Sequence, residues 1–276
     1  MIIAQHALTT MHCNCMTEAR IAKDLGYGGI EFLASKIHRY LDNGHDIAAL
    51  AKACSAAKTP AVCINALADA DRLDTLEHSQ LLAECEKLSA AAAGLRCPTI
   101  QLVFRERLAG RPWPEVRKLT AANAAKIADI GKQYGVRFQL EPLAWAPMRS
   151  LAQSLEVIDE AQRDNLGMVI DFWHLWAGGA TSPDDVARLD KRMIYGVHFC
   201  DGKRKPGLTV NDEAQLRAYL PGDGDIDVQA WTDAVKATGY DGSWSAETYS
   251  PPHWELDLYD LARDCKQLME HYIFGR

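Results

Sequence analysis

The sequence predicts an α/β protein of the (β/α)8 TIM-barrel class, with residues 1–276 forming a single domain. Short apolar runs alternate with helix-like segments along the whole chain, which is typical of βα units in a parallel sheet. Several of these apolar runs end in an ionisable residue, as expected where strands converge on the rim of a barrel. The length of 276 residues suits such a barrel, and we find no internal repeat or linker.

Four βα units are expected in the first half of the chain. Gly26 ends the first helix, as a glycine just past a helix terminus commonly does. Pro60 precedes the third strand, where its missing N–H costs no ladder hydrogen bond, and Pro114 suits the first turn of a helix. The expected strands are Ile2–Leu8, Gly28–Leu33, Ala61–Leu67 and Thr99–Phe104, and the helices are Met16–Leu25, Ile47–Ala57, Thr75–Ala93 and Trp113–Tyr134.

Four further units follow in the second half. Pro142 comes directly after the fifth strand and supports ending the strand there. Residues 200–225 contain several glycines and prolines but few periodic apolar positions, so we expect a long loop that serves as a lid or binds a partner. The expected strands are Val136–Glu141, Leu166–Asp171, Met193–Phe199 and Ser243–Glu247, and the helices are Leu151–Ala161, Pro183–Leu189, Asp227–Thr238 and Leu256–Tyr272.

A doubly wound open sheet is the competing architecture, because alternation of strands and helices alone does not distinguish it from a barrel. Such sheets often carry a glycine-rich phosphate loop between a strand and the helix that follows it. Here Gly26-Tyr-Gly-Gly precedes a strand instead of opening a helix, so it fails this test for a dinucleotide site. The barrel is therefore favoured.

Composition and charge narrow the class of partner. The net charge of −7 leaves no basic stripe for nucleic acid, and no apolar stretch is long enough to span a membrane. The N-terminus lacks the features of a secretory signal, and the eight cysteines show no C-x-x-C spacing, which together favour reduced thiols in a cytoplasmic protein. A small molecule is the expected partner, and the sequence leaves open whether the chain forms a homo-oligomer.

Four predicted strands carry an ionisable residue at the end of a short apolar run, namely Glu141, Asp171, His198 and Glu247. Each charge at the end of a buried strand is costly unless it is paired or bound to a metal. A salt bridge or helix cap would explain any one of them alone, but barrel closure would bring all four to one rim. Three carboxylates and one imidazole suit one divalent ion, with Mn, Mg, Co and Zn all open.

Other polar residues fall near the same predicted rim. His174 follows strand six and could reach a substrate hydroxyl, although packing on a neighbouring tryptophan is the alternative. Asp201 could orient the His198 ring, and Lys203 or Arg204 could hold substrate oxygens, with solvated loop charges as the alternative. Residues with weaker positional signals are Asn65 near the end of strand three, Glu31, His6 and His12.

Four segments in the second half resemble the sugar phosphate isomerase/epimerase family of xylose isomerase-like barrels. They are Arg163-Asp-Asn-Leu-Gly-Met-Val-Ile-Asp-Phe-Trp-His, Val197-His-Phe-Cys-Asp, Pro221-Gly-Asp-Gly-Asp-Ile-Asp and Gly239-Tyr-Asp-Gly-Ser-Trp-Ser-Ala-Glu. Ile64-Asn-Ala-Leu and Leu208-Thr-Val-Asn-Asp-Glu are similar to the family members that isomerise the keto-inositol inosose. The resemblance implies a divalent ion on the four strand-end residues, and substrate contacts at the positions of His174 and Arg204.

The expected activity is isomerisation or epimerisation of a sugar, keto-inositol or related polyol through an enediolate. In this hypothesis Glu141 and Glu247 bind the metal and also act as the acid/base pair, since two carboxylates on different strands can exchange a proton with one substrate. The alternative is a metal-dependent dehydratase acting on inosose or 3-dehydroshikimate, because Asp171-Phe-Trp-His-Leu-Trp also resembles dehydratases of the latter kind.

Two other classes fit the sequence less well. Multi-zinc barrels that cut DNA need further histidine and carboxylate ligands and a cationic groove, whereas this chain is acidic. A sugar-binding protein without catalysis would not require both Glu141 and Glu247. An enzyme acting on a small molecule is therefore the leading expectation.

Overall fold

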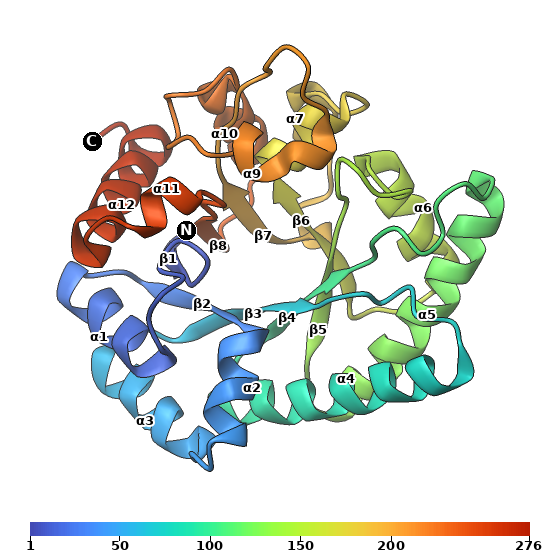
Figure 1. Cartoon of the computed structure of the whole chain (residues 1–276), viewed down its shortest axis with the longest axis horizontal. Coiled ribbons are helices and arrows are strands. Elements are labelled where there is room, and N and C mark those ends of the chain that lie inside the picture. Colours follow the sequence, from blue (N-terminus) through green and yellow to red (C-terminus); the bar gives the residue numbers. More distant parts are fainter.

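The computed structural model of the protein describes residues 1–276 as a closed barrel of eight parallel strands, ordered β1 to β8 as in the chain and surrounded by helices (Figure 1). This confirms the predicted fold class and rules out the open sheet, because β1 pairs with both β2 and β8. The strands are β1 Ile2–His6, β2 Gly29–Leu33, β3 Ala61–Leu67, β4 Thr99–Val103, β5 Arg137–Glu141, β6 Leu166–Asp171, β7 Ile194–Phe199 and β8 Ser243–Ala246.

Twelve α-helices accompany the strands, and most begin at a side chain that accepts a hydrogen bond from the first turn. They are α1 Cys15–Leu25, α2 Ala34–Asp42, α3 Ile47–Ala57, α4 Thr75–Leu95, α5 Trp113–Gln133, α6 Leu151–Ala161, α7 Phe172–Gly178, α8 Pro183–Ala187, α9 Glu213–Leu216, α10 Val228–Ala237, α11 Pro251–Trp254 and α12 Leu258–Phe274. The helices include no segment with the length and hydropathy of a membrane span.

The structure adds helices that the sequence pattern did not predict. Helix α2 starts directly after β2, and its N-cap residue Leu33 provides no side-chain cap, so the usual start signal is missing. Helix α7 follows β6 without a loop and is capped by Asp171. The predicted loop 200–225 contains the short helix α9, which lies beside α7 on the upper side of Figure 1.

Side chains on the outer face of the barrel pack against the helices to form the main hydrophobic core. Large residues in this layer are fully buried, including Phe32, Phe138, Phe199 and Trp244. Part of the interior below the rim is polar instead. There, Gln139 Nε2 donates to Gln101 Oε1 at 3.0 Å, and Gln101 Nε2 donates to Glu141 Oε2 at 2.8 Å. These buried amides support a charged group at the mouth.

Candidate active site

A cavity of about 520 Å³ opens at the carboxyl ends of the strands, where enzymes of this fold place their active sites. Its lining includes Glu141, His174, Arg217, Glu247 and Asn65 between apolar walls. A larger surface groove of about 780 Å³ runs along α3 and the end of α4, but no carboxylate or imidazole lines it. Of these two hollows, only the strand-end cavity is lined by carboxylates and an imidazole.

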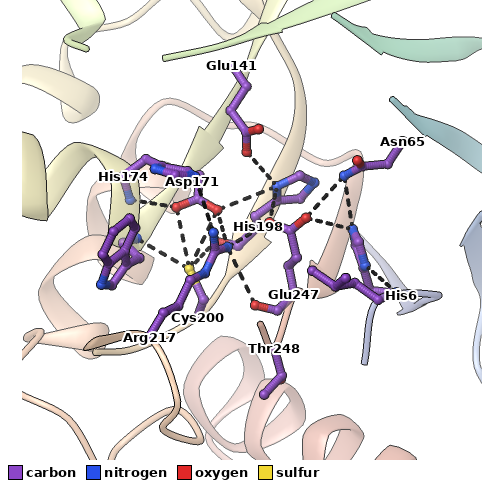
Figure 2. A network of polar contacts seen from close by, with 12 residues as sticks. His6, Asn65, Glu141, Asp171, His174, His198, Cys200, Arg217, Glu247 and Thr248 are labelled. Atoms are coloured by element: carbon purple, nitrogen blue, oxygen red, sulfur yellow. Dashed lines mark hydrogen bonds and ion pairs between the residues drawn. The ribbon is translucent and has the colours of Figure 1, made fainter. Parts of the chain in front are cut away.

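Strand geometry brings together the four strand-end residues Glu141, Asp171, His198 and Glu247. One potential ligand atom from each lies within 4.8 Å of the others, and all four side chains are buried. Asp171 and His198 are direct neighbours in the β6/β7 register, while Glu141 ends β5 and Glu247 follows β8. Figure 2 shows the two glutamates reaching the His198 ring from different sides.

The two nitrogens of His198 face different partners. Nδ1 lies 3.1 Å from Glu247 Oε2, 3.2 Å from Glu141 Oε1 and 3.5 Å from Asp171 Oδ2. Nε2 lies 3.0 Å from Glu31 Oε1 on the opposite side of the ring. Burial alone would lower the pKa of His198, but the negative charges of Glu247 and Glu31 outweigh it and raise that pKa well above its ordinary value.

Arg217 contributes a buried positive charge from the long loop after β7. Its Nη2 donates to Asp171 Oδ2 and to Glu247 Oε2, both at 2.6 Å, and Nη1 donates to Glu213 Oε1 at 2.9 Å. Burial alone would raise the pKa of Asp171 and of Glu247. Nearby positive charges outweigh burial and lower both pKa values: Arg217 acts on Asp171, and His198 and Arg217 act on Glu247. These two groups stay ionised.

Glu141 behaves differently from Glu247. Burial is the dominant influence on it and raises the pKa of Glu141 above its ordinary value, with the charge of Glu247 acting in the same direction. The site thus contains two glutamates whose pKa values are displaced in opposite directions by their surroundings. Such a pair is suited to opposite roles in proton transfer.

Two of the four residues predicted as substrate contacts lie in the cavity. Asn65 Nδ2 donates to Glu247 Oε1 at 3.1 Å. The ring of His174 accepts a hydrogen bond from the Ala144 N–H on Nδ1 at 3.2 Å, while its Nε2 lies 3.2 Å from Arg217 Nη1. Both side chains can meet a ligand in the cavity.

The structure does not bring Lys203 and Arg204 into the cavity. The Arg204 guanidinium stacks over the Trp176 ring, 4.4 Å from its centroid, and the Lys203 ammonium lies 4.7 Å from the centre of the Tyr219 ring. Both border a separate surface pocket of about 300 Å³. Arg204 is exposed and Lys203 is partly exposed, and neither side chain lines the strand-end cavity.

Asp201 does not orient His198, contrary to the sequence-based prediction. Its carboxylate accepts hydrogen bonds from the backbone N–H groups of Gly202, Gly222, Gly224 and Ile226 at 2.7–3.2 Å. A Cβ atom on Gly224 would lie 1.9 Å from Asp201 Oδ1, so glycine permits this close approach. Asp201 therefore shapes the long loop that carries Arg217.

Arg217 is the main residue of the site that sequence reasoning missed. It lies within the loop 200–225, and its partners Asp171 and Glu247 are 46 and 30 residues away in the chain, so no local spacing links them. The only available signal was the length of the loop, which suggested a functional segment. Glu31 and His6 were noted as rim residues, and the structure places both beside the cluster.

The chemistry of the four-residue cluster fits a divalent cation. Three carboxylates and one imidazole nitrogen converge at this point. The single positive charge of Arg217 does not balance the two carboxylates, Asp171 and Glu247, to which it is bound. Carboxylate and imidazole donors suit Mn, Mg, Co or Zn. A cation held there would offset the repulsion among the buried acids.

The fold and the site define a parallel (β/α)8 barrel whose mouth holds a buried cluster of three carboxylates and one imidazole that could bind a metal ion. The xylose isomerase-like TIM barrel family matches residues 19–269, and the chain belongs to this family. The resemblance noted in the sequence is thereby confirmed.

Three relatives illustrate the range of the family. Inosose isomerase of Halalkalibacterium halodurans is 24% identical over 266 residues, covering 94% of this chain and 92% of the relative. The crystal structure of the IolI protein with a bound zinc atom superimposes with a TM-score of 0.91 at 23% identity, covering 100% of this chain and 99% of the other. A 3-dehydroshikimate dehydratase of Pseudomonas aeruginosa is 26% identical over 133 residues, covering 48% of this chain and 21% of the relative.

Proposed function

We propose that this protein is a divalent-metal-dependent isomerase or epimerase of a sugar, keto-inositol or related polyol. The observation that carries the proposal is the pair of buried glutamates, Glu141 and Glu247, that face one cavity beside Asp171 and His198. Similarity along nearly the whole chain to an inosose isomerase supports the substrate class.

The proposed metal ligands are Glu141, Asp171, His198 and Glu247. A divalent ion bound there would polarise a substrate carbonyl and make the neighbouring C–H group more acidic. The zinc atom in the structure of the IolI protein supports the binding of a metal ion by this fold. Activity measured with Mn, Mg, Co and Zn in turn will identify the ion that the enzyme uses.

Glu247 is the proposed base, because its carboxylate is held ionised by His198 and Arg217. Glu141 is the proposed partner of Glu247 in this exchange, because its carboxylate lines the same cavity and can carry a proton back to the substrate. Proton removal by one group and return by the other, to the same carbon or to its neighbour, gives epimerisation or isomerisation respectively. Arg217, His174 and Asn65 present hydrogen-bonding atoms toward substrate oxygens in the same cavity.

The eight buried, unpaired cysteines support a reducing compartment, and we place the enzyme in the cytoplasm. The acidic chain and the lining of the cavity support a small-molecule substrate instead of nucleic acid. We propose that residues 1–276 act as one domain. A homo-oligomer is compatible with this function but is not required by it, because all the proposed site residues come from one chain.

A dehydratase is the second candidate, favoured by the local match to the Pseudomonas aeruginosa enzyme. Both activities begin by removing a proton next to a carbonyl. If the carbanion has a hydroxyl on the next carbon, its electron pair can form a C=C bond as the C–O bond breaks, and the departing hydroxide takes up a proton from an acidic group of the site and leaves as water. The outcome depends on the substrate and on the position of its leaving group.

The test is incubation with ketoses, inososes and 3-dehydroshikimate in deuterated water with each divalent ion, followed by NMR. We expect an isomer with deuterium on the α-carbon, and Glu247→Gln should lower exchange by about 10²–10⁴-fold while still binding the ion. An unsaturated product would favour the dehydratase, and no α-carbon exchange with any substrate would reject both activities. Undiminished exchange in Glu247→Gln would reject the role given to this glutamate.

A further inference from the structure

We infer that Glu31 is a positioning residue that fixes the orientation and tautomer of His198, so that Nδ1 is free to bind the divalent ion. This inference rests on the proposed metal site. It concerns a residue that lies outside the four-ligand cluster and does not itself have to contact the ion.

The first observation is the contact between the two side chains. Glu31 Oε1 lies 3.0 Å from His198 Nε2, and both residues are almost completely buried, with 4% and 0% exposure. A carboxylate can only accept a hydrogen bond, so this contact requires a proton on Nε2. Nδ1 faces the carboxylates of Glu141 and Glu247, so it also carries a proton while no ion is bound. A divalent ion among those carboxylates would take the place of the Nδ1 proton, and the neutral ring would keep its proton on Nε2, which faces Glu31.

The second observation is that Glu31 is itself held in place. Ser245 Oγ donates to Glu31 Oε2 at 2.7 Å, and Ser245 is the register partner of His198 across β7 and β8. Glu31 therefore binds one strand neighbour of His198 with one oxygen and the His198 ring with the other. This leaves the carboxylate little freedom to turn away from the ring.

Two further side chains contact Glu31 Oε1, namely Asn65, whose Nδ2 donates to it at 3.5 Å, and His6. His6 Nδ1 accepts a hydrogen bond from the Leu8 N–H at 3.0 Å, so a neutral His6 carries its proton on Nε2. That Nε2 lies 3.5 Å from Glu31 Oε1 and 3.4 Å from Glu247 Oε1. His6 thus places positive polarity between the two carboxylates and limits their repulsion.

The arrangement has a clear physical consequence for metal binding. A histidine that donates its second ring N–H to a carboxylate has a fixed tautomer and a more basic coordinating nitrogen, and loss of such a partner typically weakens metal affinity by about 10–100-fold. Glu31 occupies this place behind His198, where the sequence had suggested Asp201. The structure shows Asp201 bound to loop backbone instead.

The experiment compares Glu31→Met, Glu31→Gln and wild type. Glu31→Met removes the acceptor at similar length, and we expect Mn²⁺ or Zn²⁺ affinity, measured by chelator competition, to fall by about 10–100-fold. Glu31→Gln keeps a carbonyl oxygen that can face His198, so it should recover most of the affinity. Glu18→Gln alters another buried acid, which pairs with Lys36 outside the cavity, and should leave affinity unchanged.

A spectroscopic measurement separates orientation from general damage. In ¹⁵N-histidine-labelled protein, the hydrogen-bonded Nε2–H of His198 should give a downfield proton signal, identified by its loss in His198→Gln. We expect this signal in ion-free and ion-loaded wild type and in Glu31→Gln, but not in Glu31→Met. Circular dichroism on each variant checks that the barrel is folded.

The outcomes distinguish the inference from the function on which it rests. Wild-type affinity in Glu31→Met, or an unchanged Nε2–H signal in that variant, would overturn the role of Glu31 and leave the metal site standing. A wild type without divalent-ion affinity would overturn the proposed function, while loss of the Nε2–H signal in Glu31→Met would still support Glu31 as the residue that orients His198.

Discussion

Removal of the Arg217 charge should destabilise the ion-free protein by about 3 kcal/mol. The Arg217→Met substitution keeps a side chain of similar length but leaves Asp171 and Glu247 without a partner that lies 2.6 Å from each carboxylate. Breaking a buried ion pair on one side costs about 3–5 kcal/mol, because the remaining charge stays desolvated. The lower end applies here, since Glu247 lines a cavity of about 520 Å³ that water can enter.

The pKa of the unpaired carboxylate gives a second estimate of the stability lost in Arg217→Met. An unpartnered carboxylate takes up a proton once its pKa passes the ambient pH, at about 1.4 kcal/mol for each unit of pKa. Protonation at neutral pH would then remove the unpaired charge, which limits the loss of stability to a few kcal/mol. For a chain of this size, about 3 kcal/mol corresponds to a lower melting temperature by roughly 5–10 °C.

The assay is urea and thermal unfolding of wild type and Arg217→Met in a chelator, followed by circular dichroism. Arg204→Met is the matched control, because this arginine lies in the same loop but is exposed, and it should change stability by less than about 0.5 kcal/mol. Added Mn²⁺ should restore part of the loss in Arg217→Met, since it supplies positive charge to the same carboxylates. Equal stability of Arg217→Met and wild type in the chelator would refute the reasoning.

Three further predictions concern packing, thiols and pH. The Gly131→Ala variant should be less stable to unfolding by about 1–3 kcal/mol although alanine favours helix more than glycine, because the new Cβ would lie 2.3 Å from Phe138 Cε2. Urea unfolding measures this loss, and the double variant with Phe138→Leu should recover stability. All eight thiols are free and buried, and burial raises the pKa of Cys85 and Cys265 to about 12. Ellman's reagent at about pH 8 should therefore leave the thiols of the native protein unreacted over minutes and react with all eight after denaturation. Rapid labelling of the native protein would contradict this. In a chelator, stability should decline as the pH falls below about 4.5 and as it rises above about 6.5. On the acid side, burial opposes ionisation of Glu31, but His198 and His6 lower its pKa, so the unfolded state binds more protons than the folded state. On the alkaline side, the raised pKa of His198 makes the folded state bind more protons than the unfolded state. A free energy of unfolding, measured in urea, that does not change with pH would contradict both effects.

Regular patterns allowed much of the fold to be predicted from the sequence. The bounds of α3, β3, α6 and β6 match the prediction residue for residue. The two strands are short, mostly apolar runs, and the two helices begin directly after the polar cap residues Asp46 and Ser150. Helix α7 was missed, since its aromatic residues follow β6 without a connecting turn, and the polar start signal is Asp171 itself, which had been assigned to the strand end.

The site was predictable where it depends on strand ends and unpredictable where it depends on loops. Strand direction and barrel closure require Glu141, Asp171 and His198 to meet at one rim. The positions of Arg204 and Arg217 depend instead on the path of an aperiodic loop. Asp201 holds this loop in place by accepting hydrogen bonds from backbone N–H groups. Such contacts leave no periodic pattern in the sequence, so they could not be predicted.

The central claim is that four strand-end side chains bind one divalent ion, and metal stoichiometry tests it most directly. Protein freed of metal and then titrated with Mn²⁺ or Zn²⁺ should bind one ion per chain, and Asp171→Asn with His198→Gln should abolish this binding while the barrel stays folded by circular dichroism. A wild type that binds no divalent ion, or a double variant that binds as tightly as wild type, would contradict the claim.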